Sequence, residues 1–334
     1  MTKKQNKKDT WKKRGIIISI LGLILVIGEL LSSPIEIPML IIGLIVLFAG
    51  AMLAAHDYLE YQKMLIDKKK KARAEEKQRE QEKQAYEERL AKRLEEIDRL
   101  KAEFSSELSA IPRQDIPIGE RVNRNRASDM PLIEFKNITK KTNIAKLFPL
   151  VVIDIETTGL YVTDDIIEVT AIKYTEGFVP ESCCSILCKP RKPIPEAATE
   201  INGITDEMVA DCPLFSTVAN GISEYIKGCT IVGHNLEFDI KRLYANGVVL
   251  PEKSRYYDTL KLARYVLDAE GSQKYNHETG EYEEVEGDVE NYKLGTLCEY
   301  YGIYRDDAHR ALSDCFATGK LFKKLIEDKT AVEA

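Results

Sequence analysis

Two apolar runs near the start of the chain restrict its folding more than any other feature. Residues 15–31 and 39–55 are 17 residues each and nearly uncharged, at the short end of what crosses a bilayer as a helix. Pro34 and Pro38 separate them and break any continuous helix. We therefore expect residues 15–56 to form a transmembrane helical hairpin. A hairpin lying part-way into one leaflet is the competing interpretation.

Charged residues beside the two runs predict how the hairpin is oriented. Seven basic residues lie in the leader, residues 1–14, and Lys63 and four lysines at 68–71 follow the second run. The intervening loop carries only Glu36. Because cytoplasmic flanks carry the excess of Lys and Arg, we expect a cell-membrane protein with both termini in the cytoplasm. A cleaved signal peptide is less favoured, since a second apolar run follows at once.

A charged segment follows the hairpin. Residues 57–111 contain fourteen acidic and fourteen basic residues and neither Pro nor Gly, which predicts a long helix. Its end carries apolar residues at heptad-like spacing: Leu90, Leu94, Ile97, Phe104, Leu108 and Ile111. This seam of about three heptads fits a coiled coil, so self-association through 90–111 and docking onto the next domain are both open. Residues 112–146 then resemble a polar linker.

The remaining chain has the composition of one globular domain, residues 147–328, with a short tail at 329–334. A net charge of −6 gives no sign of a protein that binds nucleic acid over its whole surface, so such binding requires a local site. All seven cysteines lie between Cys183 and Cys315 without a CxxC pair, which indicates reduced thiols. For Cys183, Cys184 and Cys188, small buried side chains are favoured over a zinc site.

Three segments of this domain place acidic residues where apolar runs end. Asp154 and Glu156 follow the run 150–153, and residues at i and i+2 of a strand share one face. Two adjacent carboxylates at the end of a buried strand are costly unless a cation lies between them. Asp239 falls in the first turn of a predicted helix at 236–246, and His309 and Asp314 flank the start of another at 315–325. Each acidic residue alone could instead cap a helix or pair with Arg.

The three segments together resemble the DnaQ-like (DEDDh) exonuclease superfamily. Its motifs DxExTG, HNxxFD and HxAxxD correspond here to DIETTG (154–159), HNLEFD (234–239) and HRALSD (309–314). EINGITDEM (200–208) and the DTL at 258–260 also resemble family segments. The resemblance covers about residues 147–325 and implies a ribonuclease-H-like three-layer α/β/α fold. Antiparallel strands are expected near 150–154, 166–174 and 183–188, followed by a parallel strand at 230–233 and an inserted loop or hairpin at 268–290.

The resemblance also implies the site. Metal-binding carboxylates would be Asp154, Glu156, Asp239 and Asp314, holding two divalent cations, Mg²⁺ or Mn²⁺, which oxygen ligands suit. His309 would be the general base, since imidazole titrates near neutral pH. The remaining candidates would contact the terminal nucleotide: Thr157, Thr158, Leu160, His234, Asn235 and Phe238. Of these, Phe238 is also a candidate core residue, and Asn235 a candidate for orienting the carboxylates.

Two functions from different classes follow from this pattern. The first is a membrane-anchored 3′→5′ exonuclease that hydrolyses phosphodiester bonds at nucleic-acid 3′ ends by two-metal-ion catalysis. The alternative is a membrane scaffold whose nuclease-like domain binds nucleic acid or a partner without cleavage. The expected partners are a nucleic acid with a free 3′ end and the lipid bilayer. DNA and RNA stay equally open, because no feature of the sequence points to a 2′-hydroxyl.

Overall fold

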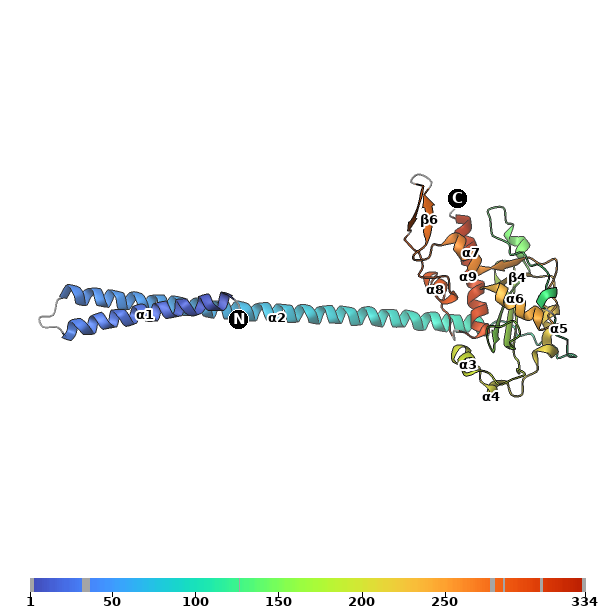
Figure 1. The fold of residues 1–334 in the computed structure, drawn as a ribbon, viewed down its shortest axis with the longest axis horizontal. Coiled ribbons are helices and arrows are strands. Elements are labelled where there is room, and N and C mark those ends of the chain that lie inside the picture. Colours follow the sequence, from blue (N-terminus) through green and yellow to red (C-terminus); the bar gives the residue numbers. More distant parts are fainter. Residues whose placement is uncertain are drawn as a thin grey trace. The chain divides into compact units, whose positions relative to one another are not determined.

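The structure is a computed structural model that describes residues 3–31, 37–125, 127–276, 280–284, 286–306 and 309–331, without the side chains of 3–14, 127 and 331. The expected loop residues 32–36, the ends of the leader and tail, and parts of the 268–290 insertion lie outside the described residues. Two compact units, Met1–Arg93 and Leu94–Ala334, make up the chain. Each is considered by itself (Figure 1).

The first unit is an antiparallel helical hairpin. Helix α1 spans Lys3–Leu31 and lies beside the first part of α2, which spans Ile37–Ser109. Gly15, Gly22, Gly43 and Gly50 are buried between the two helices. A Cβ added to Gly50 would lie 2.5 Å from the Ser19 hydroxyl, and one added to Gly15 would lie 3.1 Å from the Ala54 nitrogen. The backbones therefore approach closely, as in helix pairs packed through small residues.

The large apolar side chains of this hairpin point away from the helix pair. Ile24 is 59% exposed, Ile45 62% and Phe48 69%. By length and hydropathy, α2 contains a stretch that could cross a membrane, and residues 15–31 of α1 form a shorter apolar stretch.

The charged helix expected at 57–111 is continuous with the second apolar run, so α2 is a single helix of 73 residues. Its apolar seam has two parts. Leu90, Leu94 and Ile97 are exposed, whereas Phe104 and Ile111 are buried in the core of the second unit. Docking onto the domain therefore accounts for the second half of the seam.

The second unit is built on a mixed five-stranded sheet in the order β3-β2-β1-β4-β5. Strand β1 (Leu150–Thr157) pairs antiparallel with β2 (Ile166–Thr175), which pairs antiparallel with β3 (Val179–Leu187). Strand β4 (Thr230–Gly233) is parallel to β1, and β5 (Tyr256–Asp258) is parallel to β4. The four expected strands and their directions are confirmed, and β5 is an addition.

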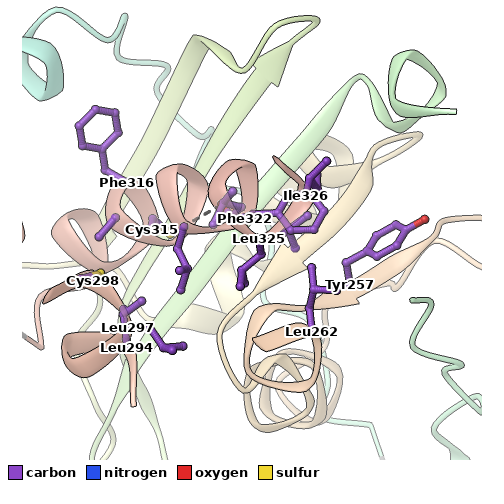
Figure 2. Packing of buried hydrophobic residues seen from close by; sticks show 14 of the residues in the cluster. Tyr257, Leu262, Leu294, Leu297, Cys298, Cys315, Phe316, Phe322, Leu325 and Ile326 are labelled. Carbon is purple, nitrogen blue, oxygen red and sulfur yellow. Dashed lines mark hydrogen bonds between the residues drawn. The ribbon is translucent and has the colours of Figure 1, made fainter. Parts of the chain in front are cut away.

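Helices cover both faces of this sheet. One face carries α7 (Thr259–Val266), α8 (Leu294–Tyr300), α9 (Ala311–Ala331) and the end of α2. The other carries α5 (Phe215–Ile226) and α6 (Leu236–Ala245). Figure 2 shows Cys315, Phe322 and Leu325 of α9 packed near Leu297 of α8 and Leu262 of α7. Side chains that alternate between the two faces of β1 produce this arrangement. Val152 faces the first helical layer, and Val151 and Ile153 face the second. The three-layer α/β/α fold is therefore confirmed.

Short elements complete the unit. Helices α3 (Glu196–Asn202) and α4 (Asp206–Val209) enclose a small separate core with Ile167, Ile194 and Ile204. The insertion expected at 268–290 contains an antiparallel hairpin of β6 (Gln273–Asn276) and β7 (Glu281–Glu284). Two 3₁₀ turns lie at Ala127–Asp129 and Ile144–Leu147. All seven cysteines are free, and all but Cys212 are buried.

The segment expected as a polar linker is instead part of the folded unit, and its residues 112–138 are called the strap here. At one edge of the sheet, the backbone N–H of Cys183 in β3 donates to the Pro112 carbonyl at 2.8 Å. The Gln114 N–H donates in return to the Cys183 carbonyl, also at 2.8 Å. At the opposite edge, Lys136 N–H donates to the Tyr256 carbonyl at 2.8 Å. Between these edges Ile116, Val122, Met130, Ile133 and Phe135 pack onto the α5–α6 layer.

Close packing shows how tightly the strap is held. A Cβ at Gly221 of α5 would collide with Ile116, and one at Gly247 would collide with Val122. The N–H groups of Gly119 and Val122 donate to the carbonyls of Thr217 and Ser216 at 2.8 and 3.0 Å. A flexible linker could not satisfy these contacts, so experiments on the domain must retain the strap.

Candidate active site

Two carboxylates lie side by side at the end of β1. Asp154 and Glu156 share one face of the strand, opposite Thr170 and Glu168 of β2. The strand reaches this point through four buried apolar residues, 150–153. The hydrophobic layer therefore ends where the carboxylates begin, and both side chains keep partial access to solvent.

Asp314 reaches the same place from the first turn of α9. One ligand oxygen from each of Asp154, Glu156 and Asp314 lies within 4.8 Å of the other two. Asp314 is buried, and the start of a helix favours a negative charge there. Three hard oxygen ligands at this spacing fit a shared metal ion.

Asp239 approaches the cluster from α6. Its Oδ1 accepts a hydrogen bond of 3.2 Å from the Ile155 N–H, between the two β1 carboxylates. The residue is buried in the first turn of α6. The structure thus brings all four carboxylates singled out in the sequence to one end of β1.

Electrostatics show that this cluster is short of positive charge. Burial raises the pKa of Asp154 well above its usual range, and the charges of Asp239, Asp314 and Glu156 raise it further. Burial, followed by repulsion from Asp314 and Glu168, raises the pKa of Glu156 to about 8. Burial also raises the pKa values of Asp239 and Asp314. Because buried carboxylates disfavour ionisation unless a cation compensates, the donor set fits a hard metal ion.

Glu168 is a fifth acidic residue at this site that the sequence analysis missed. It is buried in β2 and accepts hydrogen bonds of 3.0 and 3.1 Å from the Arg310 guanidinium and of 3.1 Å from the Ala311 N–H. This ion pair fixes the first turn of α9, which carries Asp314. A charged residue inside the apolar run IIEVTAI was the signal that could have revealed it.

Arg305 is the second residue that was missed. Its guanidinium lies 3.2 Å from Asp314 Oδ1, and both side chains are largely buried. It therefore supplies part of the positive charge that lowers the pKa of Asp314 against the effect of burial. No spacing pattern in the sequence linked Arg305 to the motif, so only the structure could reveal this contact.

His309 lies in the turn that enters α9, with an exposed side chain. Its φ of 65° is in the left-handed region, which is uncommon for a residue with a side chain. Its backbone N–H donates to the Asp314 carboxylate, and its ring lies close enough to help lower the pKa of Asp314. The imidazole is therefore open to solvent at the entrance of the helix that carries Asp314.

The residues of the HN motif make different contacts. His234 is bonded through Nδ1 to the Thr259 hydroxyl at 2.9 Å, and burial lowers its pKa to about 4. Asn235 has a left-handed φ of 58°, and its backbone N–H donates to Asp258. No hydrogen bond among the described residues joins its side chain to the four carboxylates. Phe238 is half-buried under the Arg242 guanidinium, 3.2 Å from ring centroid to Cζ, rather than in the core.

The expected nucleotide-contacting loop directly follows β1. The Thr157 hydroxyl donates to the Gly159 carbonyl at 2.7 Å, and the Thr158 N–H donates to the Asp165 carbonyl at 2.9 Å. The Thr158 N–H therefore already has a hydrogen-bond acceptor within the loop. Leu160 is 83% exposed, with its carbonyl bonded to Arg242.

Comparisons with known proteins agree with this geometry. The model of the RNase_T family, described as "Exonuclease", matches residues 151–322. A DNA polymerase III PolC-type protein from Caldanaerobacter subterraneus subsp. tengcongensis is 33% identical over 180 residues, 53% of this chain and 11% of that protein. The 3′-5′ exonuclease DinG from Bacillus subtilis is 31% identical over 183 residues, 53% of this chain and 17% of that protein. This chain thus covers only a small part of either relative.

Solved structures are also similar. Exonuclease X in complex with 5′ overhanging duplex DNA is 26% identical, with a TM-score of 0.39 over 55% of this chain and 99% of that chain. Exonuclease I from E. coli in complex with a dT13 oligonucleotide is 22% identical, with a TM-score of 0.43 over 55% of this chain and 42% of that chain.

The fold gathers acidic side chains at the end of its first strand, and the matching family model is that of an exonuclease domain. The chain belongs to the RNase_T exonuclease family, within the DnaQ-like 3′→5′ exonuclease superfamily.

Proposed function

We propose that this chain is a membrane-anchored 3′→5′ exonuclease that removes nucleotides from the 3′ end of a nucleic acid with two divalent cations, Mg²⁺ or Mn²⁺. The observation that most directly supports it is the convergence of Asp154, Glu156 and Asp314 to within 4.8 Å. Asp239 sits against the backbone between the first two. The 31% identical DinG relative is itself named a 3′-5′ exonuclease.

Each side chain has a task in this reaction. The four carboxylates hold the cations, which supply charge stabilisation at the phosphate oxygens. His309 takes a proton from the attacking water, and its exposed position at the entrance of α9 suits that task. The water oxygen bonds to phosphorus as the bond from phosphorus to the 3′-oxygen breaks, and the departing 3′-oxygen takes a proton from solvent. The products are a nucleoside 5′-monophosphate and a shortened strand with a 3′-hydroxyl. Glu168 and Arg310 keep α9, and thus Asp314, in place.

The test uses the full chain in detergent, because the strap is integral to the domain. Single-stranded DNA and RNA labelled at the 3′ or the 5′ end are incubated with Mg²⁺, with Mn²⁺ or with EDTA. We expect immediate release of labelled mononucleotide from the 3′-labelled strand and a ladder of shortened strands from the 5′-labelled one. Tight binding without any shortening, on DNA and RNA alike, would instead support the non-cleaving scaffold.

Metal binding should change the pH dependence of stability. Without cations, the raised pKa values mean that the folded site binds more protons than the unfolded chain. This difference extends from the ordinary pKa range of carboxyl groups up to about pH 8, the pKa of Glu156. Unfolding free energy then falls as pH rises through this window. Saturating Mg²⁺ binds the ionised site, so it should stabilise the protein more at pH 8 than at pH 5. Thermal unfolding followed by circular dichroism measures both.

A double variant, Asp154→Asn with Glu156→Gln, is the control for that experiment. It removes two of the repelling charges and two ligands, so both the pH dependence and the Mg²⁺ effect should shrink. An equal Mg²⁺ effect at both pH values in the unmodified protein would argue against a cation at this cluster.

The proposed anchor rests on the hairpin. Glycines lie between its helices, and Ile and Phe side chains point outward. This arrangement fits a lipid environment better than water. The positively charged flanks favour cytoplasmic termini. The exposed seam of Leu90, Leu94 and Ile97 further supports self-association through the part of 90–111 that the domain does not cover.

The anchor makes a clear prediction about membranes. The full chain should remain with the bilayer after a carbonate wash at high pH, whereas a variant beginning at Asp57 should be released. Protease added to sealed, right-side-out vesicles should leave the nuclease domain intact, and it should digest the domain once detergent is present. Digestion of the domain without detergent would refute the proposed orientation.

A further inference from the structure

The loop after β1, residues 158–165, is a closed unit with an apolar tip. At its neck the Thr158 N–H donates to the Asp165 carbonyl at 2.9 Å, and the Asp165 N–H donates to the Thr158 hydroxyl at 3.1 Å. Asp164 Oδ2 accepts from the Tyr161 N–H at 2.7 Å. Leu160 is 83% exposed and Tyr161 77%. Two large side chains are therefore exposed on the loop that directly follows the strand carrying Asp154 and Glu156.

Two arginines hold the neck of this loop. Arg191 donates to both oxygens of Asp165, from Nε at 2.8 Å and from its backbone N–H at 2.9 Å. Arg124 donates to the Thr163 carbonyl and to Asp165 Oδ1, both at 2.8 Å. The Asp165 side chain is only 14% exposed, so these contacts are partly shielded from water and stronger than surface pairs.

Arg124 also reaches the tip of the loop through a chain of contacts. The same guanidinium donates to Asn246 Oδ1 at 2.6 Å, and the Asn246 amide donates to the Arg242 carbonyl at 2.9 Å. Arg242 in turn donates to the Leu160 carbonyl. Because Arg124 belongs to the strap, a residue that precedes β1 in the chain supports the loop at both neck and tip.

We propose that Arg124 is a positioning residue that fixes the 158–165 loop so that Leu160 and Tyr161 contact the terminal nucleotide. This inference rests on the proposed exonuclease function. A guanidinium can satisfy three acceptors in one fixed plane, which neither a lysine nor water reproduces. Without it, the neck keeps Arg191, so the loop stays attached but loses its defined orientation.

Kinetics on two substrates test the role. Arg124→Ala should lower kcat/KM for a single-stranded oligonucleotide by about tenfold or more, because a small misplacement of bound substrate is costly. Hydrolysis of bis(4-nitrophenyl) phosphate, which needs the carboxylates but offers no nucleobase, should change by less than about twofold, since Arg124 touches none of the proposed metal ligands. Equal losses on both substrates, or none on the oligonucleotide, would overturn the inference.

Three further variants sharpen the experiment. Arg121→Ala removes the same charge from the same strap at an exposed position and should leave both activities unchanged. Arg124→Lys keeps the charge but loses the planar fork, so it should stay impaired on the oligonucleotide. In a double-mutant cycle, Arg124→Ala should add little to Tyr161→Ala, because both act on the same contact. Full additivity would show that Arg124 acts elsewhere.

Hydrogen exchange separates this inference from the proposed function. The amides of Thr158 and Tyr161 are bonded within the loop, so peptides covering 158–165 should exchange faster in Arg124→Ala than in Arg121→Ala. If the unmodified protein cleaves neither substrate, the proposed function fails, and unchanged exchange would separately refute the positioning role.

Discussion

Replacing Asp154 by asparagine should abolish nucleotide release from a 3′-labelled oligonucleotide. The substitution keeps the shape of the side chain but removes the charge that lies among Asp239, Asp314 and Glu156. Loss of a residue that merely supports a metal ligand costs about 10- to 100-fold in related metal sites. Loss of a ligand at the centre of the cluster should therefore exceed about a hundredfold, measured as initial rate at saturating Mg²⁺.

The same variant should become more stable, which distinguishes loss of a ligand from loss of fold. Without cations, Asp154→Asn removes one of five mutually repelling carboxylates, so its melting temperature at pH 8 should rise above that of the unmodified protein. Asp211→Asn makes the same chemical change at an exposed position outside the four carboxylates. It should alter neither nucleotide release nor the melting temperature. Retention of more than about a tenth of the activity by Asp154→Asn would remove Asp154 from the proposed metal site.

Part of the site follows from local rules alone. The i, i+2 spacing of Asp154 and Glu156 requires that they share a face once β1 is a strand, and the apolar run before them predicts that strand. Asp239 and Asp314 are different, because nothing local to either residue brings it to β1. Only the resemblance of the three motifs to one family placed them there, and the structure shows their convergence.

The strap shows why other parts could not be predicted. Its apolar residues, such as Ile116, Val122 and Phe135, follow neither a helical nor a strand period, since they pack against helices rather than within a regular element. Their polar surroundings resemble a linker. Ile116 packs against Gly221 and Val122 against Gly247, which are 105 and 125 positions later in the chain.

Charge pairs inside the site were equally invisible from local patterns. Glu168 is stabilised by Arg310, 142 positions away, and Arg124 of the strap donates to Asp165, 41 positions away. These ion pairs depend on the tertiary fold rather than on neighbours in sequence. A buried charge in an apolar strand is nevertheless a usable warning, because it requires a partner.

Removing the imidazole of His309 is the second change with a large expected effect. Its φ of 65° makes glycine the best replacement, because glycine adopts this conformation without strain whereas alanine does not. His309→Gly should lower kcat by about 10²- to 10⁴-fold, the usual contribution of a general base. Mg²⁺ affinity, measured by calorimetry, should change little, since the four carboxylates remain.

Two further results would show that the lost activity is due to the missing imidazole and not to a changed conformation of the turn. Added imidazole should restore part of the activity of His309→Gly, because the vacated exposed position admits a free base, and it should not restore Asp154→Asn. His309→Asn, which also tolerates a left-handed φ, should stay as inactive as the glycine variant. If His309→Gly retained nearly full kcat, proton transfer would pass directly to solvent, and His309 would have no catalytic part in the reaction.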